Sequence, residues 1–188
     1  MKSQEFEPAP FVKYNEEGTL SMPVLIELLQ AVLDKGKPFR FEATGGSMSP
    51  FVRDGDVITV SPLSDTSPRL GDVVAFIRPE SGKLAVHRVV GKWDGSYLIR
   101  GDSAPDSADL IPRANVLGRV TRVERDGKRV YLGLGPERYL IAFLTRRGLL
   151  WPLLLPVWRL VRPVVRLFGS QYRAEKAPAE EEHLAPVE

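Results

Sequence analysis

The chain has 188 residues, 43% hydrophobic and 27% charged, so it can bury a core but is too short for a large modular enzyme. Its 26 Lys and Arg residues against 24 Asp and Glu residues give a formal charge of +2, too balanced for a general nucleic-acid binder, and no nucleic-acid partner is expected. The absence of cysteine excludes disulfides, thiolate metal sites, iron–sulfur clusters and cysteine nucleophiles, but leaves the redox compartment open.

The first two segments predict a lead-in and a helix. Residues 1–19 are polar and contain prolines, so we expect them to be poorly ordered. They include acidic residues and lack an apolar stretch, so neither a cleavable signal peptide nor an N-terminal membrane anchor is expected. Segment 20–37 has a plausible cap at Ser21, a stop at Gly36 and a predicted amphipathic helix over roughly 22–35. Its apolar residues at helical spacing are Leu25, Leu28, Leu29, Val32 and Leu33.

The pattern changes over residues 38–135 to short runs rich in β-branched and aromatic side chains, separated by turn signals such as Asp54-Gly55 and Asp126-Gly127. The seven runs are FRFEATG, DVITVSP, DVVAFIR, LAVHRVVGKW, SYLIRGD, NVLGRVTRVER and KRVYLGLG. They predict a mainly β fold: an antiparallel β-rich domain, closed or folded upon itself, with the helix across one end or face.

Segment 137–168 is apolar and contains six arginines and two tryptophans. Its longest uncharged stretch, 148–158, has eleven residues, whereas a spanning helix needs about 20. The segment either forms helices that pack on the β domain or lies in a membrane interface with its arginines near anionic headgroups. The arginines favour peripheral membrane contact, so the expected localisation is membrane-associated or cytoplasmic. The charged tail, 169–188, is predicted to be disordered.

Two of the candidate catalytic side chains are a histidine and a serine. His183 lies in the tail and is interpreted as a bystander. His87 lies in a strand-like run on the same face as Ala85 and Val89, where a single histidine is more often structural than catalytic. Ser47 follows two glycines in TGGSMSPFVRDGD, which would allow a sharp turn that exposes its hydroxyl, although a flexible loop is the simpler interpretation. A nucleophilic serine needs a base within hydrogen-bond reach and donors for the oxyanion.

A third segment, RGDSAPDSADLIP, supplies aspartates in a predicted loop between two strands. The candidates are Asp102, Asp106 and Asp109. A carboxylate bound to the imidazole nitrogen remote from the serine would hold the histidine tautomer. Aspartates in turns more often bind the local backbone, and the spacing does not choose among the three.

The boxes GGSMSPFVRDGDVITV, GDVVAFIRP, HRVVG, RGDSAPDSAD and GRV, in this order over about 40–121, resemble the signal peptidase I family and its self-cleaving repressor relatives. The resemblance implies that Ser47 is the nucleophile, beside Met48 and Pro50 in the substrate-binding wall. It also implies that His87 is the base, as in the archaeal and endoplasmic-reticulum branch. The common bacterial branch uses lysine.

The same resemblance matches Asp102 to the aspartate of the family's Gly-Asp box, where it would orient His87, with Asp106 or Asp109 as the alternative acid. Lys83 has the wrong position to be the base. Many relatives carry a serine for the oxyanion hole two positions before the nucleophile. Gly45 stands there in this chain, which leaves the Ser47 amide and Thr44 as candidate donors.

The leading hypothesis is therefore a serine endopeptidase of the signal peptidase I-like class that cleaves a peptide or preprotein through a Ser-His(-Asp) acyl-enzyme mechanism. No cofactor and no metal are expected. Two alternatives remain: a regulatory protein like the self-cleaving repressors, and a non-catalytic peptide-binding protein. The repressor hypothesis is weaker because residues 1–37 supply a single helix, too little for a helix-turn-helix, and because those relatives use lysine as base.

Overall fold

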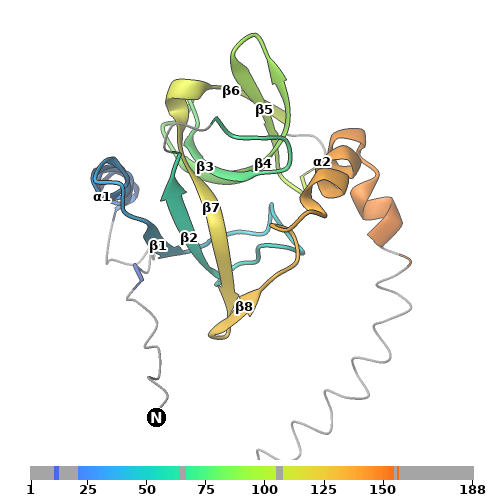
Figure 1. Ribbon diagram of the computed structural model, residues 1–188, viewed down its shortest axis with the longest axis horizontal. Helices are drawn as coiled ribbons and strands as arrows, with labels where there is room; N and C mark the ends of the chain where they lie inside the picture. Colours follow the sequence, from blue (N-terminus) through green and yellow to red (C-terminus); the bar gives the residue numbers. More distant parts are fainter. Residues whose placement is uncertain (1–10, 13–20, 64–66, 105–107, 155, 157–188) are drawn as a thin grey trace, which may run out of the picture. The chain divides into compact units, whose positions relative to one another are not determined.

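The computed structural model describes residues 11–12, 21–63, 67–104, 108–154 and 156 (Figure 1). The fold is mainly antiparallel β with an N-terminal helix, as the sequence predicts. The chain divides into two compact units, Met1–Leu150 and Trp151–Glu188, and all named helices and strands belong to the first. The predicted tail at 169–188, including His183, and most of the predicted lead-in lie outside the described residues.

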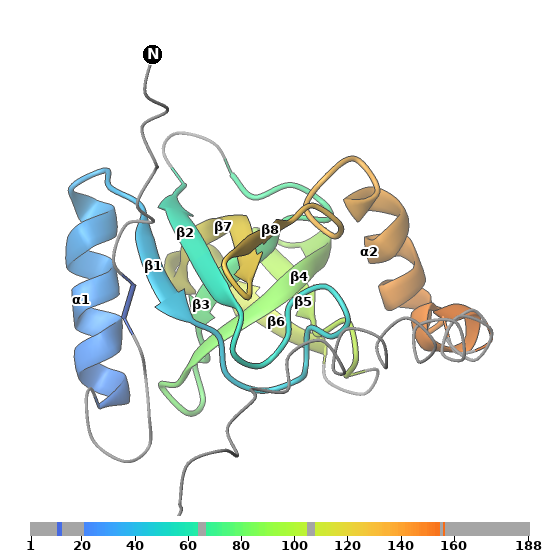
Figure 2. The same cartoon turned by 90° about the horizontal axis from the view of Figure 1, so that it is seen from below.

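Helix α1 (Met22–Asp34) agrees with the predicted helix. Ser21 occupies the N-cap position, but its side chain makes no capping hydrogen bond. Three leucines of the predicted apolar face are buried against the sheet, while Leu28 stays 38% exposed. The buried leucines are Leu25, Leu29 and Leu33. Figure 2 shows α1 lying alongside β1, at the side of the sheet opposite α2.

The sheet has eight strands, all paired antiparallel: β1 (Phe39–Glu42), β2 (Val57–Pro62), β3 (Val73–Ile77), β4 (Leu84–Trp93), β5 (Ser96–Arg100), β6 (Ala108–Pro112), β7 (Val116–Arg125) and β8 (Lys128–Val130). The strand order is β1-β2-β7-β3-β4-β5-β6, with β8 paired to β7. Because β7 joins β2 to β3, it brings the serine-bearing box next to the histidine-bearing one.

All seven predicted strand runs form strands, and the structure adds an eighth that the sequence analysis placed in a loop. This strand is β6, which pairs with β5 from Ala108 opposite Arg100 to Pro112 opposite Ser96. Only Ile111 of β6 is buried, so the strand lacks the repeated apolar alternation that marks the others. Asp109 therefore lies in an edge strand and not in a loop.

Strand β4 contributes to both apolar clusters of the domain. Leu84 and Val86 pack with the cluster beneath α1, whereas Ala85 and Val89 pack with the cluster that contains Phe76. This division agrees with the predicted alternation of faces along the strand. The side chain of His87 belongs to the second face and contacts the Phe76 ring, with 5.8 Å between centroids.

Helix α2 (Arg138–Arg147) begins the apolar, arginine-rich segment and ends at Gly148, whose φ of 68° is left-handed. Its buried residues, Ile141, Ala142 and Thr145, lie on the face toward the sheet, where α2 contacts β4. Residues 157–168 of the segment lie outside the described residues. Among the helices that are described, none is long and apolar enough to cross a membrane.

Candidate active site

Ser47 lies in the loop that connects β1 to β2, and local hydrogen bonds hold this loop in a compact turn. Gly45 has a φ of +86°, which a side chain would strain, and its N–H donates to Asp54 Oδ1 at 2.8 Å. The amides of Phe51 and Val52 both donate to the Met48 carbonyl at 3.1 Å. Since the Met48 and Val52 side chains are buried, the turn is anchored to the core and holds Ser47 at the surface of the groove described below.

The Gly-Asp box supports the same turn from behind. The Ser103 N–H donates to the Ser47 carbonyl at 2.8 Å, and the Ser103 hydroxyl donates to the Gly46 carbonyl at 2.5 Å. A Cβ on Gly101 would lie 2.8 Å from the Ser47 carbonyl oxygen and 3.3 Å from the Ser47 Cβ. Only glycine allows this close approach, so the box fixes the position of the Ser47 backbone.

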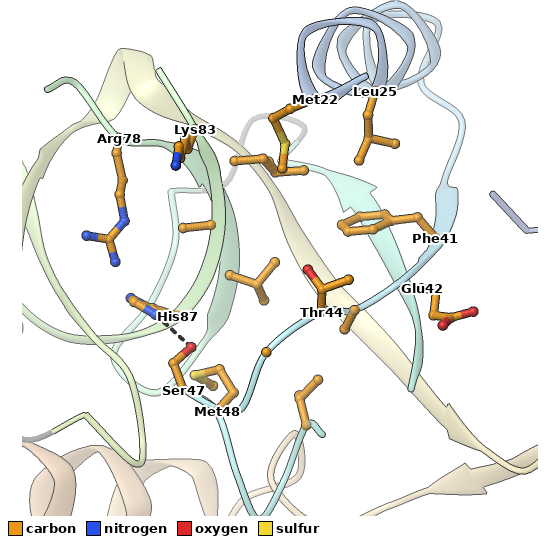
Figure 3. Close-up of a pocket in the computed structure, with 16 residues that line it drawn as sticks. Met22, Leu25, Phe41, Glu42, Thr44, Ser47, Met48, Arg78, Lys83 and His87 are labelled. Carbon is orange, nitrogen blue, oxygen red and sulfur yellow. Dashed lines mark hydrogen bonds between the residues drawn. The ribbon is translucent and has the colours of Figure 1, made fainter. Parts of the chain in front are cut away.

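His87 lies in β4 opposite Val74 of β3 and is 3% exposed. Its Nε2 is 3.0 Å from Ser47 Oγ, and Figure 3 shows the two side chains pointing toward each other. The other ring nitrogen, Nδ1, is buried and has no hydrogen-bond partner among the described residues. With the proton on Nδ1, Nε2 is free to accept the serine proton.

The pKa of His87 is lowered from 6.5 to about 4, and the largest cause is burial, because the charged imidazolium loses its solvation. The positive charge of Arg78 contributes to this lowering, and the negative charge of Asp109 opposes it. The imidazole is therefore neutral at pH 7, the form in which it can accept a proton from Ser47.

Asp102 does not hydrogen-bond His87, so the expectation that it orients the imidazole is wrong. Its carboxylate accepts two short bonds from Arg88, at 2.8 Å from Nε and 2.6 Å from Nη2, and a third from the Thr145 hydroxyl at 3.1 Å. Adjacent residues of a strand point to opposite faces, so Arg88 and its aspartate lie on the far side of β4 from the His87 ring. Asp102 is the counter-ion of a fully buried arginine.

The other two candidate acids are Asp109 and Asp106. Asp109 Oδ2 forms a partly exposed ion pair with Arg78 Nη1 at 3.2 Å, and its charge reaches His87 without a hydrogen bond. Asp106 lies outside the described residues. Of the carboxylates that the structure describes, none hydrogen-bonds His87, so the geometry is that of a serine–histidine pair.

A groove of about 310 Å³ opens beside this pair (Figure 3). Its apolar walls come from α1, β1, the serine turn and β4, and its charged residues are Glu42, Arg78 and Lys83. The apolar lining consists of Met22, Leu25, Phe41, Ala43, Met48, Val52, Leu84, Ala85 and Val86. Of the two predicted substrate-binding residues, Met48 lines the groove and Pro50 does not.

Most of the residues that line the groove were not predicted from the sequence, among them Met22 and Leu25 of α1, and Arg78. Nothing in the helix pattern reveals that its first turn lies over the serine. The position of Arg78 could have been predicted from the sequence, because it follows β3 directly and therefore lies in the same hairpin as the start of β4. Lys83, considered only as a base, also lines the groove.

The candidate oxyanion donors are unequal. No acceptor among the described residues takes up the Ser47 amide hydrogen. The Gly45 amide is occupied by Asp54. Thr44 is exposed and lines the groove, as expected for a residue that could contact a bound peptide. The described residues contain no group of three His, Cys, Asp or Glu that could hold a metal ion.

Comparison with known proteins identifies the family of the chain. Among curated proteins none matches the chain. The model of the Peptidase S24-like family matches residues 9–121, which include the serine turn, β4 and the Gly-Asp box. The match covers more than half of the 188 residues and confirms the resemblance found in the sequence. This chain belongs to the Peptidase S24-like family.

Proposed function

We propose that this protein is a serine endopeptidase of the signal-peptidase-like class, with Ser47 as nucleophile and His87 as general base. The observation that carries the proposal is the 3.0 Å distance between Ser47 Oγ and His87 Nε2 at the wall of the groove. A serine hydroxyl becomes an effective nucleophile when a base within hydrogen-bond reach removes its proton. Membership of the Peptidase S24-like family supports peptidase chemistry at the level of the family.

The reaction would proceed through an acyl-enzyme. Ser47 Oγ attacks the peptide carbonyl carbon while His87 Nε2 accepts the hydroxyl proton, and the Ser47 amide donates to the resulting oxyanion. The carbon–nitrogen bond then breaks as His87 returns the proton to the leaving amine. Water, deprotonated by His87, attacks the ester, and the products are a new carboxyl end and a free Ser47.

The edge of β4 supports an extended peptide as the substrate. Residues 84–88 of β4 pair with β3 on one side, but on the other side the pairing to β5 starts only at Arg88. Four consecutive residues, 84–87, line the groove, which means that the groove runs along the strand edge that the described residues leave unpaired. An extended peptide could add to this edge through main-chain hydrogen bonds and present a carbonyl to Ser47.

The proposed substrate is a peptide or preprotein with short side chains near the scissile bond. The support comes from the family resemblance and from the small, largely apolar groove beside Ser47. Processing of a preprotein at a membrane surface would suit the same groove.

A direct test is covalent labelling of the full chain with a fluorophosphonate or β-lactam probe at pH 7, with the adduct located by mass spectrometry. We expect modification of Ser47 in the wild type and at least a hundredfold slower modification of His87→Ala, because the base is lost. Ser47→Ala should not be labelled at this position. Ser61→Ala is the control: this serine lies in β2 and does not line the groove, so Ser47 of this variant should be labelled as in the wild type.

The alternatives predict other results. If the folded wild type, incubated with and without lipid, reacts no faster than His87→Ala, the serine–histidine pair is not activated, which favours a non-catalytic peptide-binding protein. A shortened chain that accumulates in the wild type but not in Ser47→Ala would indicate self-cleavage. Hydrolysis of added peptides with an intact chain would support the endopeptidase.

A further inference from the structure

The outer face of α2 carries large apolar side chains that the described residues leave uncovered. Tyr139, Leu140 and Phe143 are 45%, 61% and 51% exposed. They recur at helical spacing on the side opposite the buried Ile141 and Ala142, and Figure 1 shows α2 at the periphery of the first unit. A ten-residue helix that is apolar on both faces is unusual in water unless its outer face has a partner.

Arginines surround these apolar side chains. The Arg147 guanidinium lies over the Phe143 ring at 5.3 Å, and the Arg138 guanidinium lies over the Tyr139 ring at 4.9 Å. Arg146 is also exposed, and its carbonyl accepts a hydrogen bond from Arg100. The outer face therefore combines insertable apolar groups with cations whose stems can lie along them.

The charge of this region is of one sign over a long stretch of sequence. No Asp or Glu occurs from residue 138 to residue 174. Seven arginines do occur there: Arg138, Arg146, Arg147, Arg159, Arg162, Arg166 and Arg173. A partner of complementary charge is negative, and a partner that accepts leucine and phenylalanine also offers an apolar interior. A bilayer with anionic headgroups has both properties.

We propose that the outer face of α2, formed by Tyr139, Leu140, Phe143, Arg146 and Arg147, docks on the surface of a membrane that contains anionic lipid. Leu140 and Phe143 enter the boundary between headgroups and acyl chains, and the arginines pair with lipid phosphates. The sheet-facing side of α2 stays in place, because Thr145 on that side donates to Asp102. The docked helix thus holds the rest of the first unit at the membrane surface.

The test uses the full chain and vesicle flotation. Vesicles contain either phosphatidylcholine alone or phosphatidylcholine with phosphatidylglycerol. We expect the wild type to bind the anionic vesicles, to bind neutral vesicles much less, and to lose binding as salt is raised, because screening weakens the arginine contacts. Leu140→Glu/Phe143→Glu should bind anionic vesicles roughly tenfold or more weakly, since two inserted apolar groups are replaced by anions.

The matched control is Val24→Glu/Leu28→Glu, which adds the same two charges to exposed apolar positions of α1. This control should bind as the wild type does. A second variant, Arg146→Gln/Arg147→Gln, adds no anion and should weaken binding to anionic vesicles only. Circular dichroism in the absence of lipid shows whether each variant is folded.

Three outcomes would overturn the proposal. Unchanged vesicle binding by the folded Leu140→Glu/Phe143→Glu protein would place the lipid contact elsewhere in the chain. Absence of wild-type binding to anionic vesicles would remove the lipid partner. A wild-type dimer in light scattering that this variant dissociates, without any vesicle binding, would assign the face to a second copy of the chain.

Discussion

Opposing electrostatic effects set the pKa of His87. Burial and the positive charge of Arg78 lower its pKa to about 4, while Asp109 acts in the opposite direction. Nδ1 has no acceptor among the described residues, so no partner there stabilises a protonated ring. The result is a base that is neutral at pH 7 and weakly basic, and whose proton affinity depends on groups that it does not touch.

This arrangement predicts the pH dependence of the reaction. The reactive form has neutral His87, so probe labelling of Ser47 should stay high as pH falls from 7 and decline only as pH passes through about 4. In Arg78→Gln one cause of the lowered pKa is removed and Asp109 loses its partner, so both changes raise the pKa of His87. The midpoint of the acid limb should therefore move to higher pH, toward 6.5.

The measurement is the rate of Ser47 labelling between pH 3.5 and 8, limited to the range in which circular dichroism shows folded protein. Lys92→Gln, which removes an exposed cation that stacks on Tyr97, is the control and should leave the midpoint unchanged. A midpoint that does not move in Arg78→Gln, or that moves to lower pH, would contradict the electrostatic role of Arg78.

At the scale of elements, the position of the serine depends on contact between two turns that are far apart in sequence. The turn of residues 101–104 donates two hydrogen bonds to the serine turn, and Gly101 lies directly against it. The strand β4 positions His87 separately. The 3.0 Å contact between Ser47 and His87 therefore depends on the relative positions of these two turns and β4.

Gly101→Ala tests this contact. The added methyl group would lie 2.8 Å from the Ser47 carbonyl oxygen, so the serine turn must shift. A displacement of about 1 Å of a reacting group can cost about a hundredfold in rate, and we expect a loss of this order in Ser47 labelling. Gly46→Ala is the control in the same turn, because its nearest neighbour would be 3.9 Å away and its rate should change less than about threefold. Equal rates for the two variants would contradict this account.

At the scale of the whole domain, Arg88 connects segments from four parts of the chain. Besides Asp102, its guanidinium donates to the carbonyls of Gly71 and Gly133 at 2.9 Å and 2.8 Å, and it lies 5.5 Å from the centre of the Phe51 ring. The guanidinium nitrogens that donate these hydrogen bonds are buried, and Arg88 as a whole is 0% exposed. A buried cation is tolerated only when it is paired and hydrogen-bonded, so this cluster is a condition for the fold.

Asp102→Asn should therefore destabilise the protein strongly. The variant leaves the Arg88 charge buried without its counter-ion, which typically costs about 3–5 kcal/mol of the free energy of unfolding. Asp109→Asn is the matched control: its ion pair with Arg78 is partly exposed, and we expect a change below about 1 kcal/mol. Urea denaturation followed by circular dichroism measures both. A stable Asp102→Asn protein would contradict the role of Asp102 as the counter-ion of the buried Arg88.

Much of the fold could be predicted from local patterns, and the serine–histidine pair could be predicted from the resemblance of the boxes to a known family. Glycine before Ser47, the two-residue alternation around His87 and the seven strand runs are properties of neighbouring residues, and the structure confirms the strands and brings the two side chains together. Strand β6 was missed because only one of its side chains is buried. Its pairing with β5, and not its own pattern, makes it a strand.

The sequence by itself determined most of the segments that become helix and strand, because periodicity and turn residues are encoded locally, and the resemblance of its boxes to a known family implied that Ser47 and His87 form a pair. Only the tertiary structure decided that Asp102 forms an ion pair with Arg88 and that the charge of Arg78 lowers the pKa of His87. It also decided that α1 lines the groove. These outcomes depend on which face of β4 a distant carboxylate approaches and on how helix and sheet pack. Several aspartates at similar spacing satisfy the same local pattern, and only burial of the Arg88 charge selects Asp102 as its partner.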